Sequence, residues 1–494
     1  MSNLVVLPII LPLLAGILAA FIPKKRTLVR ASSQAFAVIH LLLVGWIFLQ
    51  VKGQGSLVLE TGDWAAPYGI ILVGDMLSMT LVLTTNIVAV ACVFFAPKSL
   101  SDQQESFYFY TFFFMLIAGV SGAFLTGDLF NLFVFFEVLL MASYGLIVLG
   151  NGKAQLRESL KYVLINLFSS MLFVTTISFL YSVVGTVNMA QIAERVQEVE
   201  QRGVLTTIAI MFFFVFATKA AVFPLYYWLP RPYISPNPVV SALFGALLTK
   251  VGIYSILRTF TLIFNQDVEL THTLFIYLAG LTMLFGVIGA LSTNNVKLVI
   301  AYNIIPAVGF MLMGIGLFSV ESISGTIYYL VHDMIIKGVL FLLIGAIVYV
   351  AGTSDLRKMG GLIHHYPLLG WLFFVASLVL AGIPPFSGFI GKLLLLRGSL
   401  AQEEIIIVIV ALLSSLLILF SMIRIFIRGF WGEKTELSYP ERRQRGNRMA
   451  WPVAGLLTLS ILLGVGAEWF YPSIQSIADY LMNPEIYIDS VLKE

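Results

Sequence analysis

Charge and cysteine are scarce in this chain. Asp, Glu, Lys and Arg make up 11% of its 494 residues, whereas a typical soluble domain has about 25%. Hydrophobic residues make up 59%, which excludes a soluble globular protein and indicates an integral membrane protein. The lone cysteine, Cys92, excludes a disulfide framework and a cysteine-ligated iron–sulfur cluster within the chain. The net charge of +3 gives no indication of binding to nucleic acid.

Motifs for nucleotides and haem are also missing. The segment GFIGKL around Lys392 lacks the hydroxyl residue and the first-glycine spacing of a phosphate-binding loop, and it lies in an apolar run. His40 and His332 are the only histidines well inside apolar runs, and nothing pairs them as haem ligands. Nothing charged lies near His40, so we interpret it as structural. We therefore expect no cofactor and no bound metal.

Long apolar runs occupy most of the chain, and each is near the roughly 20 residues that a helix needs to cross a bilayer. We predict an all-α integral membrane fold with fourteen spans, of which the first is a full-length span rather than a cleavable signal peptide. Their approximate boundaries are 3–23, 31–51, 75–97, 107–126, 129–150, 159–185, 204–228, 238–264, 272–292, 298–319, 325–350, 367–396, 403–427 and 450–470. Several exceed 25 residues, which predicts tilted or interrupted helices.

Lysine and arginine are distributed unequally between the loops. The odd-numbered loops contain eighteen of them and the even-numbered loops five. Because positively charged loops stay in the cytoplasm, this bias predicts a multi-pass protein of the cell membrane with both termini outside the cytoplasm. Between spans, residues 186–203 predict a short surface helix, and the tail 471–494 is expected to pack on a neighbour. A solvated connector is the alternative for each segment.

Two spans combine a proline break with a lysine. Pro224 interrupts the seventh span and should free a carbonyl beside Lys219, while Pro384 and Pro385 interrupt the twelfth span shortly before Lys392. The two spans are five apart, so they run in opposite directions through the bilayer. Matched broken helices in two inverted halves are typical of a transport site, although a structural kink is the alternative. The predicted units are residues 1–106 (spans 1–3), 107–264 (spans 4–8, first repeat), 265–430 (spans 9–13, second repeat) and 431–494 (span 14 and tail).

Four lysines fall inside the predicted spans, namely Lys219, Lys250, Lys337 and Lys392. Each unpaired ammonium group at a helix centre costs about 2.5–3.5 kcal/mol. Four of them would cost on the order of 10 kcal/mol, which is comparable to the net stability of a whole protein. A chain that keeps them is expected to use them, and the movement of ions or protons is the obvious use within a membrane.

Glu137 of the fifth span has no basic residue within a turn, so we predict that it pairs with Lys219. The alternative role of this pair is purely structural. Lys250 lies about twelve residues into its span, which argues against the alternative that its ammonium group snorkels to the interface. Asp75, at the start of the third span, is expected to be interfacial.

The eleventh span contains His332, Asp333 and Lys337 within two turns. Asp333 and Lys337 have the i,i+4 spacing of an ion pair on one helix face. His332 titrates in the right range for a proton relay, and a structural histidine is an equal alternative.

Three segments resemble a known family. The run KAAVFPLYYWLPRPYISPNPVVSALFGALLTK (219–250), together with KGVLFL in the eleventh span and AGIPPFSGFIGK in the twelfth, is similar to the antiporter-like subunits of respiratory complex I and of the Mrp multisubunit cation/proton antiporters. The resemblance extends over most of spans 4–13. Within the family, the chain resembles the D subunits of the Mrp Na⁺/H⁺ antiporters most.

The resemblance implies fourteen helices, two inverted five-helix repeats with broken helices 7 and 12, and a hydrated midplane chain of ionisable residues. By motif match, Glu137 and Lys219 are the implied ion pair, Lys250 and Lys337 are central relay groups, and Lys392 is the terminal group. This chain departs from the pattern of many family members at two places: the residues after the tryptophan of span 7, and the residue four positions before the lysine of span 11. Where many members have LPDAH this chain has Leu229, Pro230, Arg231, Pro232 and Tyr233, and where many have histidine it has Asp333, with His332 one position earlier.

Three functions follow as hypotheses. The main one is a proton-translocating, non-enzymatic subunit of a multisubunit Na⁺/H⁺ antiporter with other hydrophobic subunits as partners and with protons and Na⁺ as cargo. The second is a proton-pumping subunit of a redox-driven complex of the complex I or membrane-bound hydrogenase type. The third is an assembly scaffold whose charges only hold helices together.

Overall fold

The computed structural model describes residues 2–22, 26–150, 152–432 and 442–492. Within these ranges, twelve helices are long and apolar enough to cross a membrane, and Phe109–Leu125 and Pro367–Ala381 are shorter apolar helices. Together they correspond to the fourteen predicted spans, so the predicted all-α membrane fold is confirmed.

The helices of the first half are α1 (Leu7–Ala20), α2 (Arg26–Gln54), α3 (Met76–Ser99), α4 (Asp102–Ser106), α5 (Phe109–Leu125), α6 (Leu129–Ile147), α7 (Lys153–Val184), α8 (Met189–Arg195), α9 (Arg202–Ala220), α10 (Pro230–Ile234), α11 (Pro238–Leu243) and α12 (Thr249–Leu262). Those of the second half are α13 (Val268–Leu291), α14 (Val296–Tyr302), α15 (Ile304–Leu317), α16 (Val320–Ala351), α17 (Pro367–Ala381), α18 (Ser387–Ala401), α19 (Ile405–Ile425), α20 (Arg442–Val465), α21 (Ala467–Met482) and α22 (Pro484–Leu492). A short hairpin pairs β1 (Leu57–Glu60) antiparallel with β2 (Ile71–Gly74).

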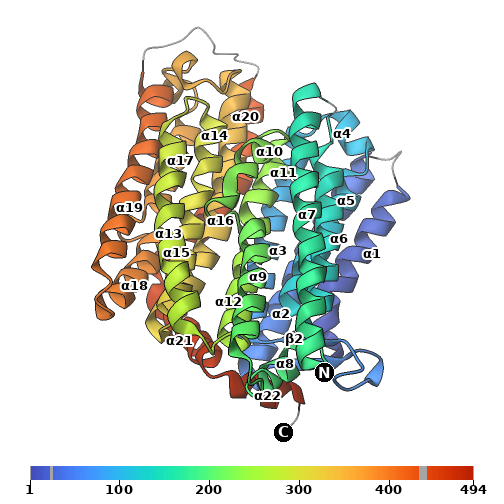
Figure 1. The fold of residues 1–494 in the computed structure, drawn as a ribbon. Helices are drawn as coiled ribbons and strands as arrows, with labels where there is room; N and C mark the ends of the chain where they lie inside the picture. Colours follow the sequence, from blue (N-terminus) through green and yellow to red (C-terminus); the bar gives the residue numbers. More distant parts are fainter. Residues whose placement is uncertain (1, 23–25, 151, 433–441, 493–494) are drawn as a thin grey trace.

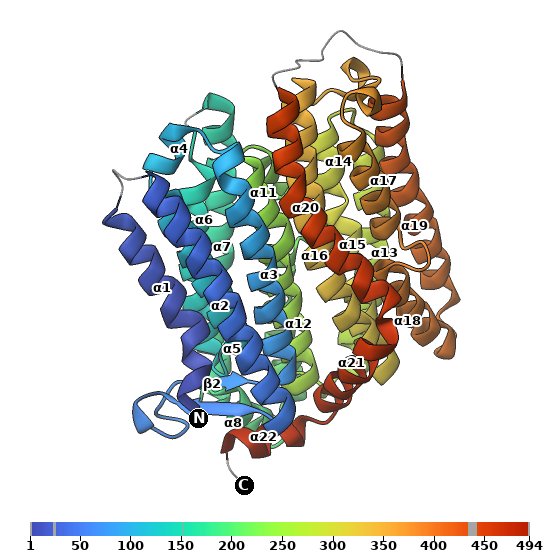
Figure 2. The same ribbon diagram turned by 180° about the vertical axis from the view of Figure 1, so that it is seen from behind.

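The helices form an elongated bundle with both termini at the same end (Figures 1 and 2). Burial identifies the centre of this bundle. The most apolar stretch of residues 238–262 is entirely buried and that of α16 is 89% buried, whereas that of α2 is only 28% buried. Helices α12 and α16 are therefore central, and α2 lies at the periphery of the bundle.

Both predicted helix breaks are present. Helix α9 ends where Ala221 adopts a left-handed conformation (φ 65°), and the amide of Val222 donates to the carbonyl of Ala217 at 2.9 Å. Helix α17 ends in the same way at Gly382 (φ 84°), where the amide of Ile383 donates to Leu378 at 3.1 Å. This is the bonding pattern of a Schellman cap, which satisfies the last carbonyls of a helix and turns the chain away. The division into two inverted repeats stays a prediction.

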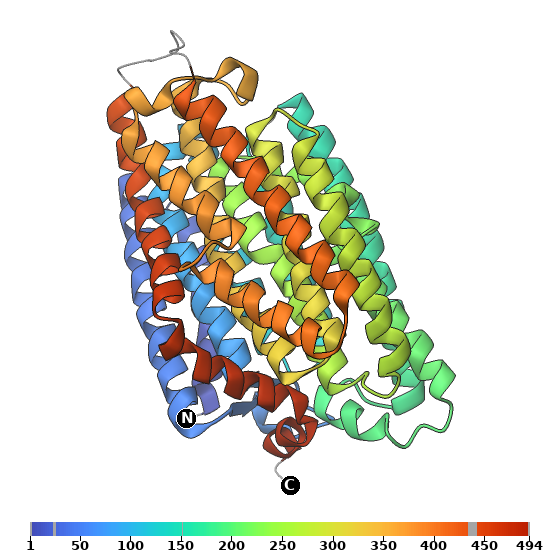
Figure 3. The same cartoon turned by 90° about the vertical axis from the view of Figure 1, so that its left-hand side faces the viewer.

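The chain end differs from the expectation. The last span ends at Val465 rather than 470, and helix α21 then crosses the end of the bundle obliquely (Figure 3). Helix α21 contacts α16 and α12, and α22 contacts α8. The tail therefore packs on its own chain. The predicted surface helix in 186–203 corresponds to α8, in which Ile192 is buried.

Candidate functional site

The four lysines are buried in the described structure. Lys250 and Lys337 have no exposed surface, and Lys219 and Lys392 are each 4% exposed. They lie on α9, α12, α16 and α18, so four different helices supply them. Such groups require polar partners, because an isolated ammonium group cannot be solvated by hydrocarbon.

Asp333 lies between two of these lysines. One of its carboxylate oxygens is 2.6 Å from Nζ of Lys250, and the other is 3.5 Å from Nζ of Lys337. All three side chains have zero exposure. The ion pair within α16 was predicted from its spacing and is confirmed, whereas the contact with Lys250 joins α16 to α12 and was not predicted. Two amines therefore share one carboxylate.

Three of the lysines also donate to a backbone carbonyl at a helix irregularity. Lys250 Nζ is 2.7 Å from the carbonyl of Gly245, within the π-helical turn Phe244–Leu248. Lys337 Nζ is 2.7 Å from that of Asn303, at the junction of α14 and α15. Lys392 Nζ is 2.8 Å from that of Ala381, the last residue before the break in span 12. Interrupted backbone thus supplies acceptors that a continuous helix would use internally.

Lys219 has different partners from those expected. Its ammonium group donates to the carbonyl and side-chain oxygens of Asn166, at 3.1 and 3.3 Å, and to the hydroxyl of Ser170 at 3.2 Å, all on α7. The predicted ion pair with Glu137 is not formed: the two interact electrostatically, but buried Oε1 of Glu137 has no hydrogen-bond partner. Lys219 lies beside the break in span 7, as predicted, because α9 ends at Ala220, but its hydrogen-bond acceptors come from α7.

His332 of α16 hydrogen-bonds α18, the second half of the broken span 12. Its Nδ1 is 2.8 Å from the hydroxyl of Ser387 on α18, and this hydroxyl is 3.1 Å from that of Ser460 on α20. Its Nε2 is buried without a partner. His332 also lines a cavity of about 330 Å³, which shares Lys52 and Ser473 with a second pocket of about 530 Å³.

Several residues of this site were not identified from the sequence, namely Asn166, Ser170, Asn303, Ser387 and Ser460. The sequence did contain a pattern that indicates the two residues of α7, Asn166 and Ser170. Tyr162, Asn166, Ser169 and Ser170 lie at helical spacing on the buried face of an otherwise apolar span. A polar stripe of this kind indicates a helix face that packs on protein rather than on lipid.

A second buried ion pair lies nearer the end of the bundle. Asp75, expected to be interfacial, is 2% exposed, caps α3 by accepting from the amide of Ser78, and lies 2.5 Å from Nη2 of Arg258. The guanidinium group of Arg258 also stacks on the ring of Tyr487 in α22, 5.2 Å from its centroid.

His40 hydrogen-bonds Asn86 at 2.7 Å, which agrees with a structural role. The described residues contain no group of three or more His, Cys, Asp or Glu that could hold a metal ion.

Comparison with known proteins gives consistent matches. Residues 126–464 match the transmembrane family described as NADH:quinone oxidoreductase/Mrp antiporter. The chain is 51% identical to the D subunit of the Na⁺/H⁺ antiporter from Alkalihalophilus pseudofirmus over 100% of both chains, and 50% identical to that from Bacillus subtilis over 100% of both chains. A chain in the solved structure of the Mrp complex from a Dietzia species is 31% identical, with 99% of each chain covered and a TM-score of 0.92. A chain of Thermus thermophilus respiratory complex I shares the fold, with a TM-score of 0.83 at 24% identity over 97% of this chain and 100% of that one.

Proposed function

The chain belongs to the NADH:quinone oxidoreductase/Mrp antiporter family of transmembrane proteins, and from this premise we propose that it is the proton-translocating subunit of a multisubunit Na⁺/H⁺ antiporter. In this role it is a secondary transporter subunit and not an enzyme. The relatives at 50% and 51% identity carry the name of such a subunit, and they match this chain from end to end.

The observation that carries the proposal is the shared carboxylate of Asp333. With both Lys250 and Lys337 protonated, this buried cluster has one positive charge that no carboxylate compensates. A cluster of two amines and one carboxylate can therefore hold one transferable proton and exchange it between two helices. A simple ion pair between α12 and α16 would need only one amine, so the presence of the second amine supports a role in proton transfer.

The proposed route begins at Glu137 and Lys219. Lys219 holds its proton while the two are paired and passes it towards Lys250 when the pair opens. The contacts of Lys219 with α7 fit the open arrangement, since its ammonium group is turned to Asn166. From Lys250 the proton crosses Asp333 to Lys337.

The second half of the route ends at Lys392, which lies within electrostatic range of Lys337 and Asp333. His332 and the hydroxyls of Ser387 and Ser460 form a hydrogen-bonded branch beside it. Proline residues 224, 384 and 385 keep the two helices broken in this scheme.

We place the chain in the cell membrane with both termini outside the cytoplasm and with other hydrophobic subunits as partners. Both termini lie at one end of the bundle (Figure 1), as an even number of spans requires. The bias of Lys and Arg towards the loops of the other end supports this orientation, because positively charged loops stay in the cytoplasm.

Two substitutions of Lys219 test the proposal. Lys219→Ala removes the amine, and Lys219→Arg keeps a positive charge that does not release its proton. We expect both to abolish Na⁺-driven proton movement in membrane vesicles, measured with a pH-sensitive dye, while the complex still assembles. The exposed Lys153→Ala is the control and should be active. Activity retained by either Lys219 variant would exclude the proposed role.

The two other hypotheses predict different results. A scaffold predicts that activity falls only in proportion to the amount of assembled complex. A subunit of a redox-driven pump, which the family also includes, predicts flavin or iron–sulfur subunits among the proteins that co-purify with a tagged chain. Small hydrophobic subunits alone are expected from the antiporter.

A further inference from the structure

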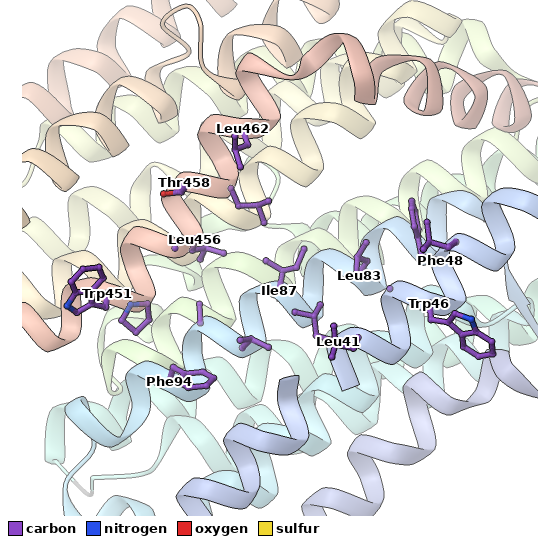
Figure 4. Close-up of a pocket in the computed structure, with 18 of the residues that line it drawn as sticks. Leu41, Trp46, Phe48, Leu83, Ile87, Phe94, Trp451, Leu456, Thr458 and Leu462 are labelled. Atoms are coloured by element: carbon purple, nitrogen blue, oxygen red, sulfur yellow. The ribbon is translucent and has the colours of Figure 1, made fainter. Parts of the chain in front are cut away.

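An open apolar groove runs along the outside of the bundle, apart from the four buried lysines. The groove has a volume of about 1070 Å³ and is open on one side. Its lining residues come from α2, α3 and α20 (Figure 4), and Figure 2 shows these three helices on the same side of the bundle. Its walls are apolar over most of their length, with Leu41 of α2, Ile87 of α3 and Leu456 of α20 facing it. The groove is hollow partly because it contains glycine: a Cβ at Gly455 would meet no atom within 4 Å.

Three cations gather at one end of the groove. Lys98 lines it there, and its ammonium group donates to the carbonyl of Arg448 at 2.6 Å. Arg445 donates in turn to the carbonyl of Lys98 at 2.8 Å. We refer to Lys98, Arg445 and Arg448 as the basic corner. None of the three forms an ion pair with another described residue.

We propose that the groove binds an anionic phospholipid, with its acyl chains between α2, α3 and α20 and its phosphate at the basic corner. The charges are complementary. Lys98 and Arg445 donate to backbone carbonyls rather than to carboxylates, so their remaining N–H groups are available for phosphate oxygens. Trp451 lies beside the corner and is 72% exposed, which suits an indole at the level of lipid headgroups. Basic pockets between transmembrane helices are typical sites for anionic headgroups.

The charge at the groove favours a lipid over an apolar partner helix. An apolar helix laid against the groove would leave the basic corner facing apolar side chains, whereas a lipid brings its own negative charge to that position.

Photo-crosslinking tests which molecule occupies the groove. A benzoylphenylalanine at Gly455 fits the open space there, and one at Leu164, which is 56% exposed on α7, is the control for bulk lipid. The whole complex is placed in nanodiscs with equal parts of phosphatidylglycerol and phosphatidylcholine that have the same acyl chains. After illumination, mass spectrometry of the chain identifies the adducts. We expect phosphatidylglycerol to be enriched at 455 relative to 164.

Two results would overturn the proposal at this step. A cross-link from 455 to a partner subunit would show that protein fills the groove. Equal amounts of the two lipids at 455 and 164 would show that the groove has no preference for negative charge.

Charge substitutions test the basic corner by itself. Replacing Lys98, Arg445 and Arg448 by Gln should reduce the preference for phosphatidylglycerol by about fivefold for each cation removed. The matched control replaces Lys153, Arg231 and Lys358 by Gln, which are exposed cations outside the groove, and should keep the preference. An unchanged preference in the first triple variant would refute the assignment of the headgroup site. The readout is binding, so the result does not depend on the proposed transport function.

Discussion

The imidazole of His332 and the hydroxyl of Ser387 lie 2.8 Å apart and join α16 to the second half of a broken helix. Ser387 is the first residue of α18, so the break in span 12 positions this hydroxyl. Close packing holds it there, because a Cβ at the adjacent Gly388 would lie 2.3 Å from the carbonyl of Val379 and 3.0 Å from Cε1 of His332. The same break provides the carbonyl of Ala381 to Lys392. The break in span 12 therefore provides hydrogen-bond partners to two titratable groups, His332 and Lys392.

Ser387→Ala should slow proton-coupled exchange without preventing assembly. The substitution removes the hydrogen bond of His332 and disconnects Ser460, and one such bond contributes ~1 kcal/mol. We expect a decrease in initial rate of about fivefold to tenfold in vesicles. Ser178→Ala is the matched control, because Ser178 is exposed and bonds only its own helix. A rate equal to that of the unmodified chain would mean that the His332 branch is not used.

Asp333→Asn should cost both stability and transport. It leaves the ammonium groups of Lys250 and Lys337 buried without a counter-charge, a change that costs about 3–5 kcal/mol for a buried pair. The double variant Asp333→Asn with Lys250→Met removes one of these cations as well. We expect its thermal stability in detergent to recover in large part and its transport to stay absent. Recovery of transport together with stability would indicate that the cluster is only structural.

Asp128 should make stability depend on pH. It caps α6 through the amide of Asn131, and burial raises the pKa of its carboxyl from 3.8 to about 6. The folded state therefore binds this proton more tightly than the unfolded state. The stabilisation is complete below pH ~4 and is lost as the pH rises through ~6, with about 1–2 kcal/mol of the loss above pH 5.

Asparagine caps a helix as well as aspartate and does not titrate. We therefore expect the stability of Asp128→Asn relative to the unmodified chain to increase as the pH rises from 5 to 8. Thermal denaturation of both proteins over this pH range measures the difference. Asp355→Asn is the control: hydrogen bonds from Arg357 hold the pKa of Asp355 at about 2, so its contribution is constant over this range. A difference between Asp128→Asn and the unmodified chain that does not change with pH would contradict the expectation.

Cysteine labelling should confirm the proposed orientation. The single natural cysteine, Cys92, has no exposed surface, so the unmodified chain provides a low background. Trp64 is 63% exposed and lies in the connection between β1 and β2, the hairpin at the end of the bundle where both termini lie (Figure 1), so Trp64→Cys places a thiol there. Lys153 is the first residue of α7, which begins at the other end, so Lys153→Cys places a thiol at that end. On intact cells a membrane-impermeant maleimide should label position 64 and should reach position 153 only after permeabilisation. The opposite pattern would reverse the orientation.

The spans and both helix breaks could be predicted because they depend on local sequence. Apolar length sets a span, and Pro224, Pro384 and Pro385 each remove a backbone donor wherever the helix lies. The pair Asp333–Lys337 was predictable for the same reason, since its spacing within one helix is fixed.

The remaining contacts of the site depend on how distant helices pack. Lys250 and Asp333 are far apart in sequence, and no local pattern brings α12 against α16. The predicted pair of Glu137 and Lys219 was inferred from the need of each charge for a partner. The ammonium group of Lys219 does require hydrogen-bond acceptors, but the uncharged oxygens of Asn166 and Ser170 provide them instead of the carboxylate of Glu137. Charge counting alone does not identify such neutral acceptors.

The order of synthesis gives the two buried cations of α12 different histories. Asp75 precedes Arg258 in the chain, so the carboxylate of this pair is already made when α12 is synthesised. Asp333 follows Lys250, so the ion pair of Lys250 forms only after α16 has been made, and until then its own segment supplies only the Gly245 carbonyl. An uncompensated lysine is costly in lipid, so the eleventh span completes the site of the eighth.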